Sequence, residues 1–413
     1  MPSWRDTEPG ERLVSQRKVV IMVDVPERTA GPDIDALDIL RRIAPLQCEP
    51  DALGVKEAGI ANAYAELMGE LGIEAELLEV EEGRPSVIGR VRGSGGGQSI
   101  LFNTHLLVPT SPLEEWHYDP YAITVEDGKA YGMGVSDTKA GIVAMMLAAR
   151  QIAAEGPMGD VIIGLGAGGE RAGFIGTKPI VERVRPDVAV VCEPTSLDIV
   201  YVQYGCLWVT FTVRGKQGFV DAGVSALHKS MPLYRALLEL NEEVRERRHP
   251  LLPPSKLAIN ALQAGEHWVL TPHQCVVKVD RRIIPGETVQ SATEEFEAIL
   301  ATLRSEDPQF EASMELALAL PPVEMSAESS IVAAASSAIT DRRGKAPQLL
   351  GIKGFTEMVH MYQAGVEAII CGPGSTAVIH AADEYIPVDD LYDAVDVYAG
   401  IARRITATPS AAG

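Results

Sequence analysis

The sequence predicts an α/β fold with a mostly parallel sheet, interrupted by a smaller inserted α+β unit. Short apolar runs alternate with stretches of good helix formers in the first half of the chain. Strands connected by helices form a parallel sheet that is covered on both faces. Between 204 and 322 the pattern changes to alternating strands and two amphipathic helices. A further apolar run follows near the C-terminus, so this unit is expected to lie between two parts of one α/β domain.

Hydrophobic periodicity places the elements of both units along the chain. In the α/β domain we expect strands at 74–80, 86–92, 99–103, 161–167, 188–192 and 366–371, and helices at 34–44, 57–72 and 138–154. In the inserted unit we expect strands at 207–213, 257–262 and 275–279, and helices at 231–248 and 292–303. The expected division is an N-terminal extension at 1–33, an α/β domain formed by 34–203 and 323–413, and the inserted unit at 204–322.

Composition and charge exclude several classes of protein. With 413 residues and 46% hydrophobic content, the chain is long enough for two folded domains. The net charge of -21 argues against a nucleic-acid partner, because such proteins neutralise phosphates with clustered Lys and Arg. The five cysteines stand singly, as reduced thiols do, and the apolar run at 19–23 is too short for a signal peptide or a membrane span. We therefore expect a cytoplasmic protein that binds neither membranes nor nucleic acids.

Metal-ligand side chains follow the buried runs at the points where the predicted strands end or a helix begins. These residues are His105, Asp137, Glu170, Glu193 and His380. In open α/β sheets, ligands bind at the carboxyl ends of the strands, so these side chains are expected to converge. Two imidazoles and three carboxylates suit zinc, with cobalt or manganese as alternatives. A shared carboxylate would bridge two ions that polarise a carbonyl and activate water. The sequence predicts a site for one or two ions.

Seven motifs around these residues resemble a single enzyme family. They are FNTHLLVP (102–109), DPYAITVEDGKAYGMGVSDTKAG (119–141), GGERAGFIGT (168–177), CEPTS (192–196), VRGK (213–216), DRRIIPGET (280–288) and GPGSTAVIHAADEYI (372–386). Together they resemble the zinc-dependent acetylornithine deacetylase, succinyl-diaminopimelate desuccinylase, aminoacylase and carboxypeptidase G family. The resemblance implies a zinc-peptidase-like catalytic domain and an inserted lid domain that usually forms a homodimer. It also implies hydrolysis of an N-acyl or peptide amide next to a carboxylate.

The resemblance also implies roles for individual residues. The ligand positions of the family fall on His105, Asp137, Glu193 and His380, with Asp137 as the bridging carboxylate. The substrate-binding positions fall on Arg281 or Arg282 for the carboxylate, and on Gly372 and Ser375 in the GPGS segment. His360, with Glu357 beside it, falls near the family's substrate-side segment and is a candidate replacement acid or base.

Two substitutions remove groups that the family uses. Leu107 stands where an aspartate orients the first histidine ligand, and leucine cannot accept that hydrogen bond. Phe219 stands where a lid histidine helps to stabilise the oxyanion across the dimer. Losing an oxyanion donor typically costs about 10²–10³-fold in rate. Ordinary hydrolysis is therefore expected to be slow.

A third departure concerns a pair of adjacent glutamates, of which the chain has one, in Gly169-Glu170-Arg171. If Glu170 is the ligand of the pair, Gly169 has replaced the general base. If Glu170 is the base, Arg171 has replaced the ligand and stands at the catalytic position. Two functions fit these departures. One is a divergent metal-dependent amidohydrolase with non-standard catalytic residues, and the other is a pseudo-hydrolase that serves as a binding or regulatory subunit.

Overall fold

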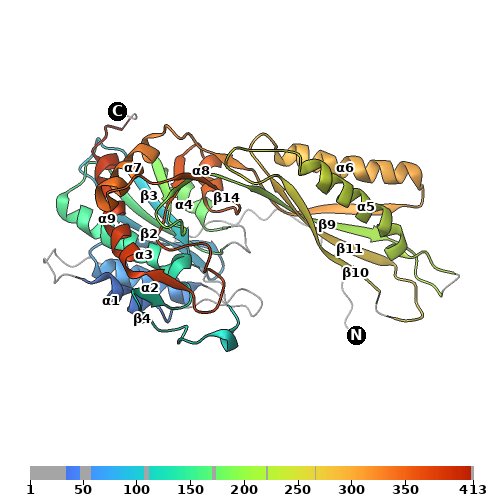
Figure 1. Ribbon diagram of the computed structural model, residues 1–413, viewed down its shortest axis with the longest axis horizontal. Helices are drawn as coiled ribbons and strands as arrows, with labels where there is room; N and C mark the ends of the chain where they lie inside the picture. Colours follow the sequence, from blue (N-terminus) through green and yellow to red (C-terminus); the bar gives the residue numbers. More distant parts are fainter. Residues whose placement is uncertain are drawn as a thin grey trace.

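The chain folds into two units that lie end to end (Figure 1). The computed structural model describes residues 34–46, 57–106, 111–169, 174–219, 222–265 and 267–410. One unit contains a nine-stranded sheet with helices on both faces, and the other is an elongated unit with a four-stranded sheet. A small third sheet of order β16-β5-β4 accompanies the first unit. Its strands are β4 (Thr124–Glu126), β5 (Lys129–Tyr131) and β16 (Tyr385–Pro387).

The nine-stranded sheet has the order β1-β2-β6-β3-β7-β15-β8-β13, and β14 also pairs with β8. Its strands are β1 (Glu74–Glu81), β2 (Arg84–Val91), β3 (Ile100–His105), β6 (Val161–Gly166), β7 (Val188–Val191), β8 (Ile199–Gln203), β13 (Val323–Glu324), β14 (Leu349–Ile352) and β15 (Glu367–Ile370). The four central strands β6, β3, β7 and β15 are parallel, whereas β1, β2 and β13 pair antiparallel. The carboxyl ends of the central strands therefore meet at one edge.

Helices cover both faces of this sheet. One face packs against α1 (Ala36–Ile43), α2 (Ala58–Glu70), α3 (Ala140–Glu155), α7 (Ser330–Arg343) and α9 (Val388–Thr406). The other face packs against α4 (Thr177–Val184) and α8 (Met358–Gln363). The central strands β3 and β6 are buried at every position. This explains why they read as unbroken apolar runs rather than as alternating strands.

The elongated unit is the inserted unit predicted from the sequence, and we call it the lid domain. It is an antiparallel sheet of order β10-β11-β9-β12 covered by two helices on one face (Figure 1). Its elements are β9 (Gly205–Arg214), α5 (Ala226–Val244), β10 (Lys256–Ala264), β11 (Gln274–Ile283), α6 (Val289–Glu306) and β12 (Glu311–Leu320). The chain enters and leaves this domain through two segments in contact. A Cβ atom on Gly205 would stand 2.4 Å from the backbone nitrogen of Pro322, so glycine permits this close approach.

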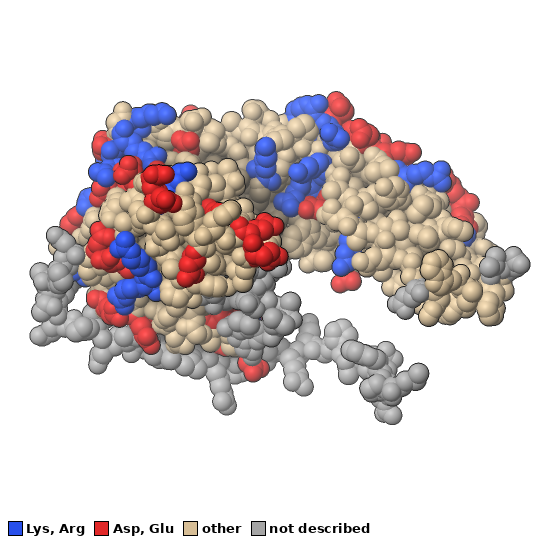
Figure 2. Space-filling view, turned by 60° about the horizontal axis from the view of Figure 1, so that its bottom comes forward, with Lys and Arg blue, Asp and Glu red and all other residues tan. Residues whose placement is uncertain are grey.

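The predicted fold class is confirmed, but the sequence did not mark several strands or the helices α4, α7, α8 and α9. β8 and β12 were not expected. β12 alternates apolar residues with small or acidic ones from Ala312 to Leu320, but only the two ends of this alternation are buried. In the described part of the chain, no helix has the length and apolar character needed to cross a membrane. On the face shown in Figure 2, Lys and Arg side chains are interspersed with Asp and Glu side chains and form no continuous basic surface.

Candidate metal centre

Three of the predicted ligands meet at the carboxyl edge of the parallel strands. His105 ends β3, Asp137 lies in the turn η3 (Val135–Lys139) before α3, and Glu193 lies two residues after β7. Nε2 of His105 is 3.3 Å from Oδ1 of Asp137 and 3.5 Å from Oε1 of Glu193. One ligand atom of each residue lies within 4.8 Å of the other two. All three residues are buried, so they form a compact donor set rather than a surface cluster of charges.

His380 joins the cluster through the second oxygen of Asp137. It lies in the loop after β15, and its Nε2 is 2.7 Å from Oδ2 of Asp137. The His380 side chain is 38% exposed, in contrast to the buried Asp137. Asp137 therefore stands between two imidazoles, with one of its oxygens directed to each.

The turn that carries Asp137 is held by the buried carboxylate of Glu384. This carboxylate accepts hydrogen bonds from the backbone N–H groups of Gly134, Ser136 and Asp137, at 2.9, 2.8 and 2.9 Å. Burial and the nearby charge of Asp137 raise the pKa of Glu384 to about 7, although the three N–H donors act in the opposite direction. Since Glu384 follows His380 by four residues, one loop positions both a ligand and the turn that holds its partner.

The GPGS segment packs against both carboxylate-bearing loops. A Cβ atom on Gly372 would lie 2.4 Å from the carbonyl oxygen of Glu193. A Cβ atom on Gly374, whose φ is +81°, would lie 2.3 Å from Oγ of Ser136. The backbone N–H of Ser375 donates to the same Oγ at 3.1 Å. These contacts account for the glycines by packing, and the substrate-binding roles of Gly372 and Ser375 stay predictions.

The electrostatics of the cluster favour a protonated His105 and an ionised Asp137. Burial alone would lower the pKa of His105, but the carboxylates of Glu193 and Asp137 raise it well above its usual value. Burial alone would raise the pKa of Asp137, but hydrogen bonds and charge from His105 and His380 hold it well below its usual range. The charge of Asp137 is therefore balanced in part by a proton on His105, which a bound cation would replace.

The residues present fit a metal ion. Oδ1 of Asp137 is buried and has no hydrogen bond of regular geometry among the described residues. A buried carboxylate oxygen normally has a partner, so this atom is suited to bind a cation. Ligand atoms that lie 2.0–2.1 Å from a tetrahedral zinc ion stand roughly 3.3 Å apart. The separations of 3.3 and 3.5 Å between His105 and the two carboxylates are close to this value.

The second ring nitrogen of His105 is not oriented by any described side chain. Nδ1 is buried and has no hydrogen-bond partner in the described ranges. A ligating histidine ordinarily donates its other N–H to a carboxylate or carbonyl. This geometry agrees with the presence of Leu107 in the sequence, although Leu107 itself lies outside the described residues.

Two further predicted residues, Glu170 and Arg171, also lie outside the described residues, so the alternative roles of Glu170 stay open. Gly169, the residue before them, is described and buried. The chain that enters this segment is anchored by Glu57. Its carboxylate accepts the backbone N–H of Gly168 at 3.0 Å and forms a buried ion pair with Arg84 at 2.7 Å.

The two arginines proposed for the substrate carboxylate occupy different environments. Arg281 is fully buried inside the lid domain, where its guanidinium donates to Ser255 and Glu287, each at 2.5 Å. Arg282 has a side chain that is 18% exposed and stacks over the ring of Phe355, 4.9 Å from its centroid. Its guanidinium also donates two hydrogen bonds to the carboxylate of Asp280, at 2.7 and 2.8 Å. Arg281 is therefore bound to residues inside the lid domain. Of the two arginines, Arg282 is the one that contacts the catalytic domain, at Phe355.

A row of aromatic rings connects this arginine to the metal cluster. The ring of Phe174 lies 6.2 Å from His105 and 6.0 Å from Phe355, over which Arg282 stacks. The candidate acid/base pair lies on the same side. Glu357 is fully buried, and its charge contributes to the raised pKa of His105. His360 lies one turn further along, in α8.

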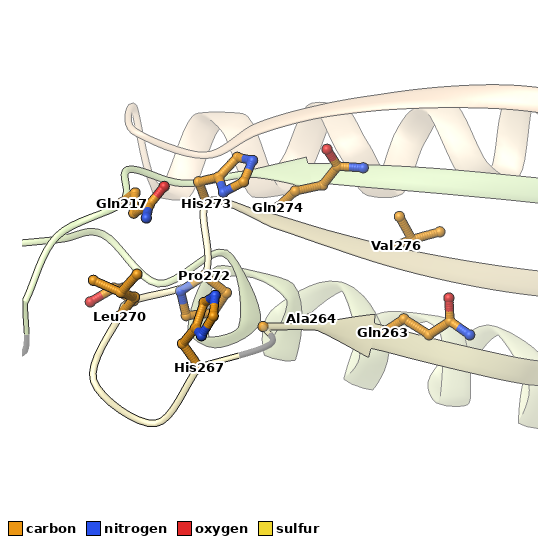
Figure 3. Close-up of a pocket in the computed structure, with 11 residues that line it drawn as sticks. Gln217, Gln263, Ala264, His267, Leu270, Pro272, His273, Gln274 and Val276 are labelled. Atoms are coloured by element: carbon orange, nitrogen blue, oxygen red, sulfur yellow. The ribbon is translucent and has the colours of Figure 1, made fainter. Parts of the chain in front are cut away.

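Phe219 lies far along the lid domain, at its tip, and is 68% exposed. The neighbouring loop carries Trp268 and Val269, which are also exposed, and the two loops are joined by a hydrogen bond from the N–H of Thr271 to the carbonyl of Gly218. A pocket of about 490 Å³ opens beside them, and His267 lies on its wall (Figure 3). Every lining residue belongs to the lid domain, so this pocket contains none of the predicted metal ligands.

Sequence reasoning missed the side chains that orient the ligands. Glu384 was read only as part of a motif, and Thr104 and Thr138 were not singled out. The hydroxyl of Thr104 lies 3.0 Å from Oε1 of Glu193 and 2.9 Å from the hydroxyl of Thr138. Thr104 directly follows the predicted run 99–103 and precedes the candidate ligand His105, which was the available indication, since buried hydroxyls require partners.

Comparisons with known proteins agree with this geometry. The chain is 29% identical to an acetylornithine deacetylase of Myxococcus xanthus over 350 residues, covering 82% of this chain and 86% of the relative. It is 28% identical to a succinyl-diaminopimelate desuccinylase of Alkalilimnicola ehrlichii over 365 residues, covering 84% and 94% of the two chains.

Solved structures show the same fold. An M20 family metallo-carboxypeptidase of Sulfolobus solfataricus superposes with a TM-score of 0.75 at 18% identity, covering 91% of this chain and 100% of that one. A dinuclear metal binding peptidase of the M20 family from Bacillus subtilis superposes with a TM-score of 0.66 at 15% identity, covering 90% and 98%. The model of peptidase family M20/M25/M40 matches residues 102–404. Because this match spans well over half of the chain, the protein belongs to peptidase family M20/M25/M40.

Proposed function

We propose that the protein is a metal-dependent amidohydrolase that cleaves the amide bond of an N-acyl amino acid or a small peptide. The observation that carries the proposal is the convergence of His105, Asp137 and Glu193 within 4.8 Å, with His380 on the far oxygen of Asp137. The relatives named above support it, since their names denote the removal of acetyl and succinyl groups.

We propose zinc as the metal, with cobalt or manganese as alternatives, in one or two ions. His105, Glu193 and Oδ1 of Asp137 would hold one ion. His380 and Oδ2 of Asp137 would hold a second, with Glu170 added if it is the ligand of its pair. When bound, the metal polarises the amide carbonyl and lowers the pKa of a bound water.

The chain's own residues supply the remaining functions. Arg282 is proposed to bind the substrate carboxylate, because it is partly exposed and contacts Phe355 of the catalytic domain. Its guanidinium already donates two hydrogen bonds to Asp280, so the substrate carboxylate would bind its remaining N–H groups or replace Asp280. Ser375, whose backbone N–H bonds Ser136 next to Asp137, is proposed as a further substrate contact. The general base is Glu170 in one of its two roles; otherwise we assign the buried Glu357, with His360 beside it.

A second candidate is a pseudo-hydrolase that binds ligands or regulates a partner without turnover. Two observations favour it: Nδ1 of His105 has no partner among the described residues, and Phe219 stands at the lid tip where a histidine is expected. Both would slow catalysis without abolishing metal binding.

Metal content and hydrolysis together separate these functions. The full-length protein is analysed for bound metal and then assayed with N-acetyl and N-succinyl amino acids and with dipeptides. The amidohydrolase predicts at least about one equivalent of metal, and hydrolysis that His105→Ala abolishes and His228→Ala, an exposed histidine on α5, preserves. Metal without hydrolysis in any substrate class supports the pseudo-hydrolase. Less than about one equivalent in the wild type would exclude the metalloenzyme.

We further propose a homodimer that forms through the lid domain, within the boundaries 204–322. The exposed apolar side chains of Phe219, Trp268 and Val269 at its tip support this, since such groups are uncommon on the surface of a monomer when clustered. Light scattering during size exclusion tests it: Trp268→Ser should shift the mass towards the monomer, and Leu349→Ser on β14 should not.

The buried free thiols Cys192, Cys206, Cys275 and Cys371 support a reducing, cytoplasmic location.

A further inference from the structure

We infer that Thr104 is a positioning residue for the metal centre, and that it orients the carboxylate of Glu193 through a hydroxyl relay that begins at Thr138. The inference rests on the metal site of the proposed function but not on hydrolysis. It assigns an orienting role to a hydroxyl on the carboxylate side of the site, whereas no described residue bonds Nδ1 of His105.

The hydrogen bonds of Thr104 have one consistent direction. Its hydroxyl lies 3.0 Å from Oε1 of Glu193 and 2.9 Å from the hydroxyl of Thr138. A hydroxyl has one proton to donate, and an ionised carboxylate can only accept. Thr104 therefore donates to Glu193 and accepts from Thr138, so the chain Thr138, Thr104, Glu193 runs in one direction into the ligand.

The register of the sheet creates this contact. β3 and β7 are parallel neighbours, with Asn103 opposite Val191, and the N–H of Cys192 donates to the carbonyl of Asn103 at 2.8 Å. This pairing carries the next residues, Thr104 and Glu193, past each other at the strand ends. Thr104 is fully buried and Thr138 is 2% exposed, so solvent does not compete for either hydroxyl.

The relay acts on the oxygen that faces the cluster. Oε1 of Glu193 is both the acceptor from Thr104 and the atom 3.5 Å from Nε2 of His105. The bond therefore limits rotation of this carboxylate. On the imidazole side, Nδ1 of His105 has no partner among the described residues. Among the described residues, Thr104 therefore orients the carboxylate of Glu193, and Glu384 orients the turn that holds Asp137.

Zinc affinity of the full-length protein tests the inference, measured by competition with a chromophoric chelator. Thr104→Val keeps the shape and removes the hydroxyl, and we expect it to weaken zinc binding by about 10–100-fold, the usual effect of losing an outer partner of a ligand. Thr104→Ser restores the hydroxyl and should return the affinity to within about threefold of the wild type. The control is Thr406→Val, because Thr406 is also a buried threonine and its hydroxyl donates to the carbonyl of Ala402 in its own helix. The zinc affinity of this variant should be unchanged.

Cobalt substitution gives a second readout that a purely structural role would not change. The visible absorption bands of bound Co²⁺ report ligand geometry, so they should shift in Thr104→Val and be preserved in Thr104→Ser. If Thr104→Val does not fold, Thr138→Val removes only the start of the relay and should weaken zinc binding by a few fold.

Several outcomes would overturn the inference: wild-type affinity and an unshifted cobalt spectrum in Thr104→Val, equal losses in the serine and valine variants, or wild-type affinity in Thr138→Val. A wild type that binds zinc but hydrolyses no amide contradicts the proposed function and leaves this test intact. A wild type that binds no zinc contradicts both.

Discussion

Oδ1 of Asp137 lies 3.3 Å from Nε2 of His105, while its Oδ2 lies 2.7 Å from Nε2 of His380, so one carboxylate links two histidines from opposite ends of the chain. Asp137→Asn keeps the shape but halves the acceptor capacity and removes the charge. We expect loss of metal and a fall in any hydrolytic rate beyond the roughly 10–100-fold typical of outer partners. Metal analysis and initial rates measure this. A variant with full metal content would show that Asp137 is not a ligand.

Leu107→Asp should strengthen metal binding. An aspartate at this position is expected to supply the acceptor that Nδ1 of His105 lacks among the described residues, and outer partners of this kind are worth about 10–100-fold in affinity. Chelator competition measures the change, and Leu107→Asn provides a control of similar size without the charge. Equal affinities in the aspartate variant and the wild type would contradict this assignment.

Glu384→Ala should destabilise the turn that carries Asp137. It removes the acceptor of three backbone N–H groups, at Gly134, Ser136 and Asp137, which are then left in a buried site. Each unsatisfied buried donor costs about 1–3 kcal/mol. We expect a lower free energy of unfolding and weaker metal binding together. Hydrogen exchange localises the effect, and protection unchanged at 134–137 would rule out this role.

Glu287→Gln should destabilise the lid domain by about 3–5 kcal/mol, because it leaves the buried charge of Arg281 without its closest partner. Burial raises the pKa of Glu287, but the charge of Arg281 and hydrogen bonds outweigh this effect and lower the pKa. A depressed pKa means that the stabilisation is present above the unfolded value of 4.5 and is lost as the pH falls below it.

The difference in unfolding free energy between this variant and the wild type should therefore shrink from pH 7 to pH 4. Chemical denaturation at both pH values measures it, with Glu297→Gln on the exposed side of α6 as the control. A difference that stays constant with pH would contradict the ionised pair.

Arg282→Ala should raise the KM for a carboxylate-bearing substrate by about 10–100-fold, since a hydrogen bond to a charged group is worth about 1.5–3 kcal/mol. Arg282→Lys keeps the charge but loses the planar two-point contact, and should recover only part of the loss. Steady-state kinetics with a substrate amide that lacks the carboxylate provide the comparison. If the two substrates lose equally, Arg282 does not recognise the carboxylate.

The two arginines show where sequence reasoning ends. Neighbouring residues of a strand point to opposite faces, so one of Arg281 and Arg282 faces the lid core and the other does not. The sequence at 280–283 does not determine which of them is buried. The structure decides this because α5 and α6 cover one face of the sheet and bury Arg281, while Arg282 contacts Phe355 of the catalytic domain.

The sequence by itself determined the α/β class, the inserted unit and the convergence of His105, Asp137 and Glu193 at one sheet edge. It could do so because unbroken apolar runs mark buried parallel strands, and the ends of such strands meet. Only the tertiary structure decided that His380 faces the far oxygen of Asp137, 243 residues away in sequence, and that Thr104 meets Glu193. These contacts depend on strand register and loop packing, which arise from the folded sheet and leave no local periodicity in the chain.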